Sequence, residues 1–324
     1  MGLLLLAVVG LGALQIIAPI RVNAPKPLYL PLSDSGRYRM QREIQALFPP
    51  YTVWHWIIQA QACKPGYYLL FPTQSAFEVW RRFTRGIQTP FRFYLRPQRS
   101  AAHLAHFLGN HLAVDSATWH HTFLSYPWKN LGLNEHTWLA IFLPDVYEVY
   151  WTVPPEKFIA RMKERYDHFW SGERMRKAAA IGLSPMEVMT LASIVEYETY
   201  RSSEKPLIAS VYLNRLRLGM PLQADPTVIY AVGDFRVQRV THRMTEVESP
   251  YNTYRRRGLP PGPIGTPSIE SIDAVLSYTP SDYLYFCARS DGSGYHDFSR
   301  TYPEHLVKAR TYQRALNRWL AQKQ

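Results

Sequence analysis

Cysteine is scarce in this sequence: its 324 residues contain only two, Cys63 and Cys287. They lie far apart in the chain and form neither a CxxC pair nor another metal-binding spacing. This excludes a small disulfide-stapled fold and a cysteine-based zinc site. We predict an isolated thiol at each position, and a disulfide in an oxidising compartment is the alternative.

Charge is also sparse, and acidic residues are fewer than basic ones. Charged residues make up 19% of the chain against 47% hydrophobic residues, which excludes a disordered protein. The formal net charge of +12 favours a polyanionic partner, which could be nucleic acid, anionic lipid or the carboxylates of peptidoglycan. No nucleic-acid-binding motif is present and the basic residues form no dense run, so we predict no nucleic acid partner.

Internal repeats, low-complexity tracts and metal-ligand spacings are absent from the sequence. Five histidines share one polar helical stretch without cysteine or acidic residues at the usual ligand spacings, so neither a metal nor another cofactor is predicted. These histidines are His103, His106, His111, His120 and His121. At about 150 residues per domain, the length of the chain indicates two domains.

One long hydrophobic run is present, at the N-terminus. Residues 3–20 carry no charge, and Gln15 is their only strongly polar residue. The run is just long enough to span a bilayer, so we predict a transmembrane anchor at residues 1–21. A cleaved signal peptide is the alternative, although no clear cleavage site is present. Arg21 and Lys26 follow the run and no basic residue precedes it, contrary to the positive-inside pattern for an anchor with a cytoplasmic N-terminus.

The stretch from Leu183 to Gly219 contains the clearest chemical candidate. Ser184, Pro185 and Glu187 combine a hydroxyl cap, a proline at the first helical position and a glutamate that can reach back to the cap, which predicts a helix start. Apolar residues then recur at helical spacing and predict one buried stripe, formed by Val188, Leu191, Ile194 and Val195.

Glu198 lies at the end of this apolar stripe. A carboxylate on an apolar face loses hydration, so its pKa rises and it can act as a general acid near neutral pH. Glu196 is two residues earlier and roughly 200° around the helix, so the two glutamates are not predicted to form a carboxylate pair. The alternative is that Glu198 marks a solvated helix end.

A second helix is predicted from Ser202 or Ser203 to Gly219, because glycine is the usual residue just past a helix end. Its buried stripe is predicted to be Ile208, Val211, Tyr212 and Leu216. Its polar residues are predicted to lie on a solvated face, and they are Asn214, Arg215 and Arg217.

Several long segments follow one another along the chain. They are KPGYYLLFPTQSAFEVWRRFTRG (64–86), FLPDVYEVYW (142–151), LASIVEYET (191–199), ASVYLNRLRLGMPLQADPTVIYAVGD (209–234), SPYNTYRRRGLPPGPIGTPSIESIDAVL (249–276), and DYLYFCAR with GYHDFS (282–299). Together they resemble the endolytic murein transglycosylases of the YceG-like (MltG) family, over most of the chain from about residue 25. One departure is Val146, where the family has Thr after the Pro144-Asp145 pair.

The resemblance implies an α+β fold with three parts. These are a transmembrane anchor at 1–21, a membrane-proximal region with a small LysM-like module at 22–125 and a transglycosylase domain at 126–324. The implied location is the cell inner membrane, crossed once, with the catalytic domain in the periplasm. The implied substrate is the glycan strand of peptidoglycan, and the implied protein partners are peptidoglycan synthases, whose nascent strands the enzyme would release.

The resemblance also implies site residues. The family's catalytic glutamate precedes Thr or Ser, which here is Glu198, the residue that the apolar stripe also indicates. The substrate-binding candidates are Thr199, Asn214, Gln223, Asp225, Tyr251, Asn252, Tyr254 and His296. Alternatives stay open for several of them. Asp225 precedes Pro226 as a helix cap would, and residues 251–254 suit an ordinary turn. His296 falls in the second strand of a predicted hairpin at 282–299, where a structural histidine is the alternative.

The implied reaction explains why one carboxylate can suffice. Most glycosidases need two, because a water or an enzyme nucleophile must be managed on the opposite face of the sugar. In the family's reaction the β-1,4 bond between N-acetylmuramic acid and N-acetylglucosamine is cut by the sugar's own 6-hydroxyl, which leaves a 1,6-anhydro end. Glu198 would protonate the departing oxygen and then accept the proton of that tethered hydroxyl.

Three other functions fit parts of the sequence. A non-catalytic, membrane-anchored peptidoglycan-binding protein would use only the LysM-like module. A hydrolase would use two acids and water, for example Glu198 with Asp225. A membrane-tethered polyanion binder is supported by charge alone, and its binding would fall steeply with salt.

Overall fold

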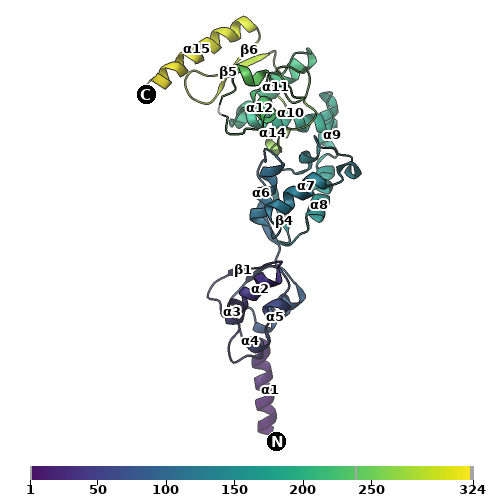
Figure 1. The fold of residues 1–324 in the computed structure, drawn as a ribbon, viewed down its shortest axis with the longest axis vertical. Helices are drawn as coiled ribbons and strands as arrows, with labels where there is room; N and C mark the ends of the chain where they lie inside the picture. Colours follow the sequence, from purple (N-terminus) through teal and green to yellow (C-terminus); the bar gives the residue numbers. More distant parts are fainter. Residues whose placement is uncertain (1, 238, 322–324) are drawn as a thin grey trace. The chain divides into compact units, whose positions relative to one another are not determined.

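The computed structural model describes residues 2–237 and 239–321 (Figure 1). The chain divides into two compact units. Unit 1 consists of Met1–Phe93, Ala105–Thr122 and Val146–Phe158, and unit 2 of Tyr94–Leu104, Phe123–Asp145 and Ile159–Gln324. The predicted α+β class is confirmed, because the described residues form helices and short two-stranded sheets, β1–β2, β3–β4 and β5–β6. The predicted boundaries at residues 21 and 125 remain predictions.

In unit 1, an antiparallel pair of strands encloses a run of short helices. The pairing places Lys26 opposite Leu70 and Leu30 opposite Gly66. Ser75 caps the longest of the helices after α1 in this part, and Gly86 ends that helix in the left-handed conformation. The elements are α1 (Gly2–Ile17), β1 (Lys26–Leu30), α2 (Asp34–Arg39), α3 (Gln41–Ala46), α4 (Val53–Ile57), a 3₁₀ turn (Ala60–Ala62), β2 (Gly66–Leu70) and α5 (Ala76–Arg85).

The core of this part is built from alternate strand residues and the buried faces of α3 and α5, as period-2 and helical patterning require. It includes Leu28, Leu30, Ile44, Phe48, Tyr68, Leu70, Val79 and Phe83, all nearly inaccessible to solvent. Cys63 is buried in the same core and Cys287 is half-buried, and both are free thiols.

The chain then continues through β3 (Phe91–Tyr94), α6 (Ala101–His111), α7 (Ser116–Ser125), 3₁₀ turns (Trp128–Leu131 and Trp138–Ile141), β4 (Val146–Val149), α8 (Pro155–Phe169) and α9 (Glu173–Ala180).

Unit 2 is organised around α10 (Pro185–Glu198), which packs against α11 (Lys205–Arg217), α12 (Asp225–Val232) and α14 (Ile269–Leu276). The predicted buried stripe of α10 was too narrow. Met189, Ala192 and Ser193 are fully buried as well, because helices cover α10 on more than one side. A 3₁₀ turn (Ser202–Glu204) precedes α11, and a short α13 (His242–Thr245) follows α12.

The predicted C-terminal hairpin is confirmed. β5 (Tyr285–Ala288) pairs antiparallel with β6 (His296–Ser299), and Gly292 supplies the left-handed turn conformation between them. The last helix, α15 (Tyr302–Ala321), contacts both strands (Figure 1).

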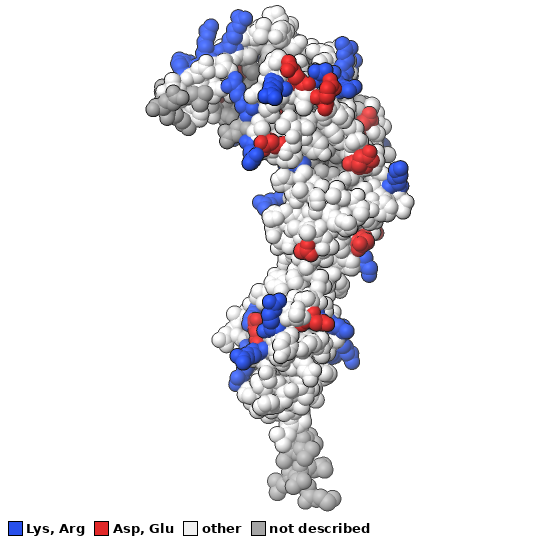
Figure 2. All heavy atoms as spheres, viewed as in Figure 1, with Lys and Arg blue, Asp and Glu red and all other residues white. Residues whose placement is uncertain are grey.

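Within the described residues, no single helix has the length and hydropathy needed to cross a bilayer, and α9 and α10 meet that test only jointly, across a bend of 79°. Basic side chains are scattered among acidic ones over the face drawn in Figure 2. This distribution agrees with the absence of a dense basic run in the sequence.

Candidate active site

The local sequence positions Glu198 as the last residue of α10. Ser184 and Glu187 form the predicted reciprocal cap: the Glu187 amide donates to the Ser184 hydroxyl, and the Ser184 amide donates to the Glu187 carboxylate. The helix ends at Glu198 because Thr199 adopts an extended conformation, with φ −144° and ψ 143°. Glu198 therefore projects from a rigid, buried helix at the point where the chain leaves it.

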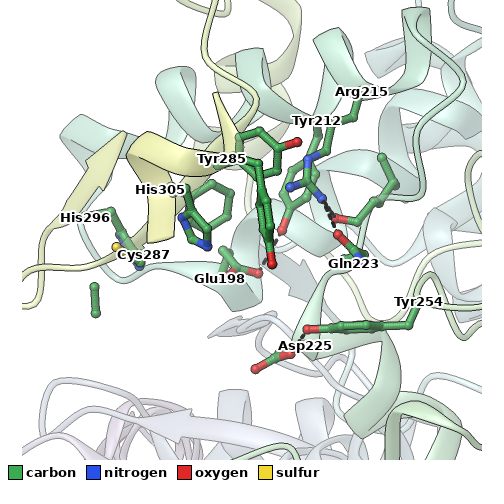
Figure 3. Close-up of a pocket in the computed structure, with 14 residues that line it drawn as sticks. Glu198, Tyr212, Arg215, Gln223, Asp225, Tyr254, Tyr285, Cys287, His296 and His305 are labelled. Atoms are coloured by element: carbon green, nitrogen blue, oxygen red, sulfur yellow. Dashed lines mark hydrogen bonds between the residues drawn. The ribbon is translucent and has the colours of Figure 1, made fainter. Parts of the chain in front are cut away.

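Glu198 lines a pocket of about 330 Å³ (Figure 3). The walls of the pocket come from α10, α11, the loop before α12, the start of α12, the loop between α13 and α14, the hairpin β5–β6 and α15. The lining residues are Glu198, Tyr212, Arg215, Leu222, Gln223, Asp225, Tyr254, Tyr285, Phe286, Cys287, Ala288, His296, Tyr302 and His305. Glu198 is half-buried in this pocket, which favours the prediction over the alternative of a solvated helix end.

The surroundings of Glu198 favour its protonated form near neutral pH. Burial is the main cause, with the negative charge of Asp225 second, and together they raise the pKa of Glu198 to about 7. The Tyr212 hydroxyl donates a hydrogen bond of 3.0 Å to Glu198 Oε2, and this bond and the Arg215 charge oppose the rise in pKa. Glu198 can therefore exist both as an acid and as a carboxylate at physiological pH.

Asp225 faces the same pocket from the first turn of α12. The Tyr254 hydroxyl donates to Asp225 Oδ1 at 2.6 Å (Figure 3). Burial, followed by this contact with Asp225, raises the pKa of Tyr254, so its phenol stays a hydrogen-bond donor. Asp225 therefore places a second acidic group beside Glu198, held in one orientation by a tyrosine.

Arg215 joins two walls of the pocket from α11. Its Nε donates to the Leu284 carbonyl at 2.6 Å and its Nη1 donates to the Leu222 carbonyl at 2.8 Å. Nη1 also donates to the Gln223 side-chain oxygen at 3.3 Å. Gln223 has φ +52°, in the left-handed region that side chains other than glycine rarely adopt, and such strain concentrates at functional sites.

The hairpin and α15 form an aromatic side of the pocket. The His305 ring stacks on Tyr285 with centroids 5.4 Å apart. Burial, and then the nearby positive charge of Arg215, lower the pKa of His305. Flat ring faces and polar tips of this kind suit contact with a sugar, which presents both apolar C–H faces and hydroxyls.

The family model described as YceG-like matches residues 39–311. The chain belongs to the YceG-like family. It is 44% identical over 123 residues to the endolytic murein transglycosylase of Bacillus subtilis strain 168, covering 38% of this chain and 33% of that protein. It is 32% identical over 161 residues to the endolytic murein transglycosylase of Streptococcus pneumoniae strain D39, covering 47% of this chain and 28% of that protein. This YceG-like chain thus spans a third or less of the length of these relatives.

A YceG-like protein of Listeria monocytogenes has a similar crystal structure. The two share 26% sequence identity with a TM-score of 0.57, and the match covers 88% of this chain and 99% of the other. The α+β fold of this YceG-like chain is thus found in a solved relative.

The structure brings five of the nine predicted site residues of this YceG-like chain into one pocket. They are Glu198, Gln223, Asp225, Tyr254 and His296. They come from segments far apart in the sequence, so their convergence depends on the packing of α10, α11, α12 and the hairpin.

The other four predicted residues do not line the pocket. Thr199 is buried and accepts a hydrogen bond from the Arg201 amide, and the Asn214 amide donates to the Ser281 and Tyr283 carbonyls. Asn252 is fully buried and donates to two backbone carbonyls. Tyr251 is buried with its ring against Tyr230. These side chains bond to the backbone or pack against another ring, and their contact with substrate remains a prediction.

Sequence patterns missed several pocket residues. Arg215 was predicted on a solvated face, yet it is only 7% exposed, and Asn214 is half-buried rather than solvated. The spacing from Tyr212 to Arg215, three residues on one helix, was a signal that both side chains share a face. Tyr285 and His305 gave no comparable signal, because only the packing of the hairpin and α15 brings them to Glu198.

Proposed function

We propose that this chain is an endolytic peptidoglycan lytic transglycosylase. It would cut the β-1,4 bond between N-acetylmuramic acid and N-acetylglucosamine inside nascent glycan strands and leave 1,6-anhydro-N-acetylmuramic acid ends. The observation that carries the proposal is Glu198 at the end of α10, in a pocket and with its pKa raised to about 7. The names of the two relatives, endolytic murein transglycosylase, support the same activity.

In the first step, protonated Glu198 donates its proton to the glycosidic oxygen as the bond from that oxygen to the anomeric carbon breaks. The 6-hydroxyl of the same muramic acid residue then bonds to the anomeric carbon, and the Glu198 carboxylate accepts the proton of that hydroxyl. The enzyme returns to its starting protonation state and no water is consumed. A pKa near the working pH suits a group that serves as acid and then as base.

The neighbours of Glu198 have distinct roles in this proposal. Tyr212 stabilises the carboxylate that remains after proton donation, through its 3.0 Å hydrogen bond. The negative charge of Asp225 stabilises the positive charge that develops at the anomeric carbon. Gln223 and Tyr254 line the same pocket and would bind sugar hydroxyl or N-acetyl groups.

The presence of Asp225 in the Glu198 pocket also favours a second function, a hydrolase in which Asp225 orients a water. Mass spectrometry of the products distinguishes the two reactions. Purified glycan strands digested by the wild type should yield anhydro ends, which are lighter by one water than the reducing ends of a hydrolase. Glu198→Gln should yield neither. Cleavage by Glu198→Gln would show that Glu198 is not the catalytic residue. Glycan strands left uncut by the wild type would indicate a protein that only binds peptidoglycan.

We further propose that residues 1–21 anchor the chain once in the cell inner membrane, with the transglycosylase domain (126–324) in the periplasm. The support is the uncharged run at 3–20 and the exposed apolar side chains Leu11, Ile16 and Ile17 of α1. The nearby Trp56, which is 71% exposed on α4, is of the type that gathers at membrane interfaces.

The region 22–125 is proposed to contain a LysM-like module that contacts glycan. The support is the antiparallel β1–β2 pair with helices between its strands. Partnership with peptidoglycan synthases, and a role in ending strand elongation, rest on family resemblance. Co-purification of the full chain with these synthases from membranes tests the partnership.

A further inference from the structure

A buried carboxylate lies behind the wall of the pocket and holds His296 at two points. The side chain of Glu204 is 8% exposed and that of His296 is 14% exposed. Glu204 Oε1 accepts from the backbone amide of His296 at 2.8 Å, and Oε2 lies 2.9 Å from His296 Nδ1. Both oxygens of one carboxylate therefore engage one residue of the hairpin.

The second ring nitrogen of His296, Nε2, is not bonded to Glu204. His296 lines the same pocket as Glu198. Nδ1 is taken by Glu204, and Phe286 packs edge-on against the ring at 5.4 Å, so the ring plane is constrained. Within the part of the chain that the structure describes, no hydrogen bond engages Nε2.

Among the described residues, the side chain of Glu204 forms hydrogen bonds only with His296. A buried carboxylate is costly unless it is paired, and the adjacent basic residue, Lys205, bonds to Glu196 and Glu270. The carboxylate of Glu204 is thus directed to a single residue, and that residue faces the site of the proposed chemistry. A carboxylate on one ring nitrogen decides which nitrogen of a neutral histidine carries the proton.

We propose that Glu204 is a positioning residue that keeps neutral His296 in the Nδ1–H tautomer, so that Nε2 accepts a hydrogen bond from a sugar hydroxyl in the pocket. This inference rests on the proposed function for the identity of the ligand. The class of ligand group follows from the chemistry, because a free imidazole nitrogen is an acceptor and sugar hydroxyls are donors. Glu204 would act on substrate through His296 and not by direct contact.

Glu204→Gln tests the proposal with little change in shape. The Gln oxygen can still accept from the His296 amide, but its NH₂ group now faces Nδ1. Nδ1 must then become the acceptor, so the proton moves to Nε2 and the acceptor in the pocket is lost. In the full chain labelled with ¹⁵N-histidine, we expect the NMR shifts of His296 to change from the Nδ1–H to the Nε2–H pattern. The kcat/KM for glycan cleavage should fall about 10-fold, the effect of one lost hydrogen bond.

Two further variants separate positioning from a structural role. Glu270→Gln is the matched control, because Glu270 is a half-exposed carboxylate that bonds to Lys205, the residue after Glu204, and is not bonded to His296. It should keep wild-type cleavage. Glu204→Gln should cause no further loss in a His296→Asn background, because the two residues act as one unit. If the losses in kcat/KM of the two single variants multiply in the variant that combines Glu204→Gln with His296→Asn, the proposal is overturned.

The wild-type spectrum is decisive even if Glu204→Gln does not fold, since an Nε2–H tautomer of His296 in the wild type overturns the proposal. The NMR result also does not depend on cleavage. If the wild type cuts no glycan, the proposed function fails by itself. Glu204 is then tested by measuring the affinity of each variant for glycan strands. Glu204→Gln should bind more weakly than the wild type, and Glu270→Gln should bind equally well. Equal affinity of Glu204→Gln and the wild type would overturn it.

Discussion

Tyr212 donates a hydrogen bond of 3.0 Å from the middle of α11 to the carboxyl of Glu198 at the end of α10. Burial and the contact with Glu198 raise the pKa of Tyr212 well above its usual range, so the phenol remains the donor at any working pH. The bond stabilises the charged form of Glu198 in surroundings that otherwise disfavour it. The balance of these effects holds the Glu198 pKa near neutrality, where an acid–base cycle operates well.

Tyr212→Phe should shift the pH profile of cleavage to higher pH. Removing a donor to the carboxylate raises the Glu198 pKa further, so the protonated acid persists to higher pH while the carboxylate base becomes scarcer. We expect cleavage at pH 7 to fall about 10-fold, with the optimum displaced upward. The ring of Phe fills the same buried space, so the fold should be retained. The melting temperature of Tyr212→Phe is the control for folding. A shift of the pH optimum of Tyr212→Phe to lower pH would contradict this role of Tyr212.

Asp225→Asn should shift the profile in the opposite direction. Asp225 raises the Glu198 pKa by its negative charge, so a neutral amide allows Glu198 to ionise at lower pH. Tyr254→Phe is the matched control, because it removes the hydroxyl that contacts Asp225 and keeps the Asp225 charge. The measurement is cleavage rate against pH for both variants. A profile of Asp225→Asn that coincides with that of the wild type would exclude an electrostatic role.

Glu198→Gln should stabilise the fold more at pH 8 than at pH 5. The folded-state pKa of Glu198, about 7, lies above its usual value of 4.5, so the folded protein binds this proton more tightly than the unfolded chain does. The wild type therefore loses stability as pH rises from about 4.5 to 7, and Gln avoids that loss. We expect a gain of about 1–3 kcal/mol in the free energy of unfolding at pH 8 and little at pH 5. Thermal unfolding at both pH values measures this, and an equal effect at both would contradict the raised pKa.

Arg215→Ala should destabilise unit 2 by about 3 kcal/mol, because it leaves buried backbone carbonyls of Leu222 and Leu284 without their donor. Arg217→Ala is the control on the same helix. Arg217 is exposed, and its contacts with Asn214 and Tyr278 should contribute less than about 0.5 kcal/mol. Denaturant unfolding of the two variants gives the comparison. Similar losses in the free energy of unfolding for the two variants would mean that the buried contacts of Arg215 stabilise unit 2 no more than the exposed contacts of Arg217 do.

The conclusion that Glu196 and Glu198 do not form a carboxylate pair is confirmed by the structure. Glu196 Oε2 lies 3.3 Å from the buried Lys205 ammonium and accepts from Ser268 and Ser271 at the start of α14. Glu198 faces the pocket instead. Helical geometry over two residues was sufficient for this prediction, since the angle between their side chains follows from the pitch of the helix.

The sequence by itself determined the features that depend on neighbours within about four residues. These include the Ser184 cap, the left-handed Gly219 after α11, the hairpin turn at Gly292 and the position of Glu198 at a helix end. Helix caps, turns and periodic stripes are local, because their hydrogen bonds and spacings join residues close in the chain.

Only the tertiary structure decided which groups meet Glu198. Tyr212 was predicted merely as part of a buried stripe, Arg215 as a solvated residue, and His305 not at all. Each reaches the pocket because α11 and α15 pack where they do, and local spacing carries no information about such packing. The pKa of Glu198 depends on those neighbours and on the burial they cause. The sequence could therefore indicate Glu198 as the catalytic candidate, whereas the raised pKa of Glu198 arises from contacts between distant segments.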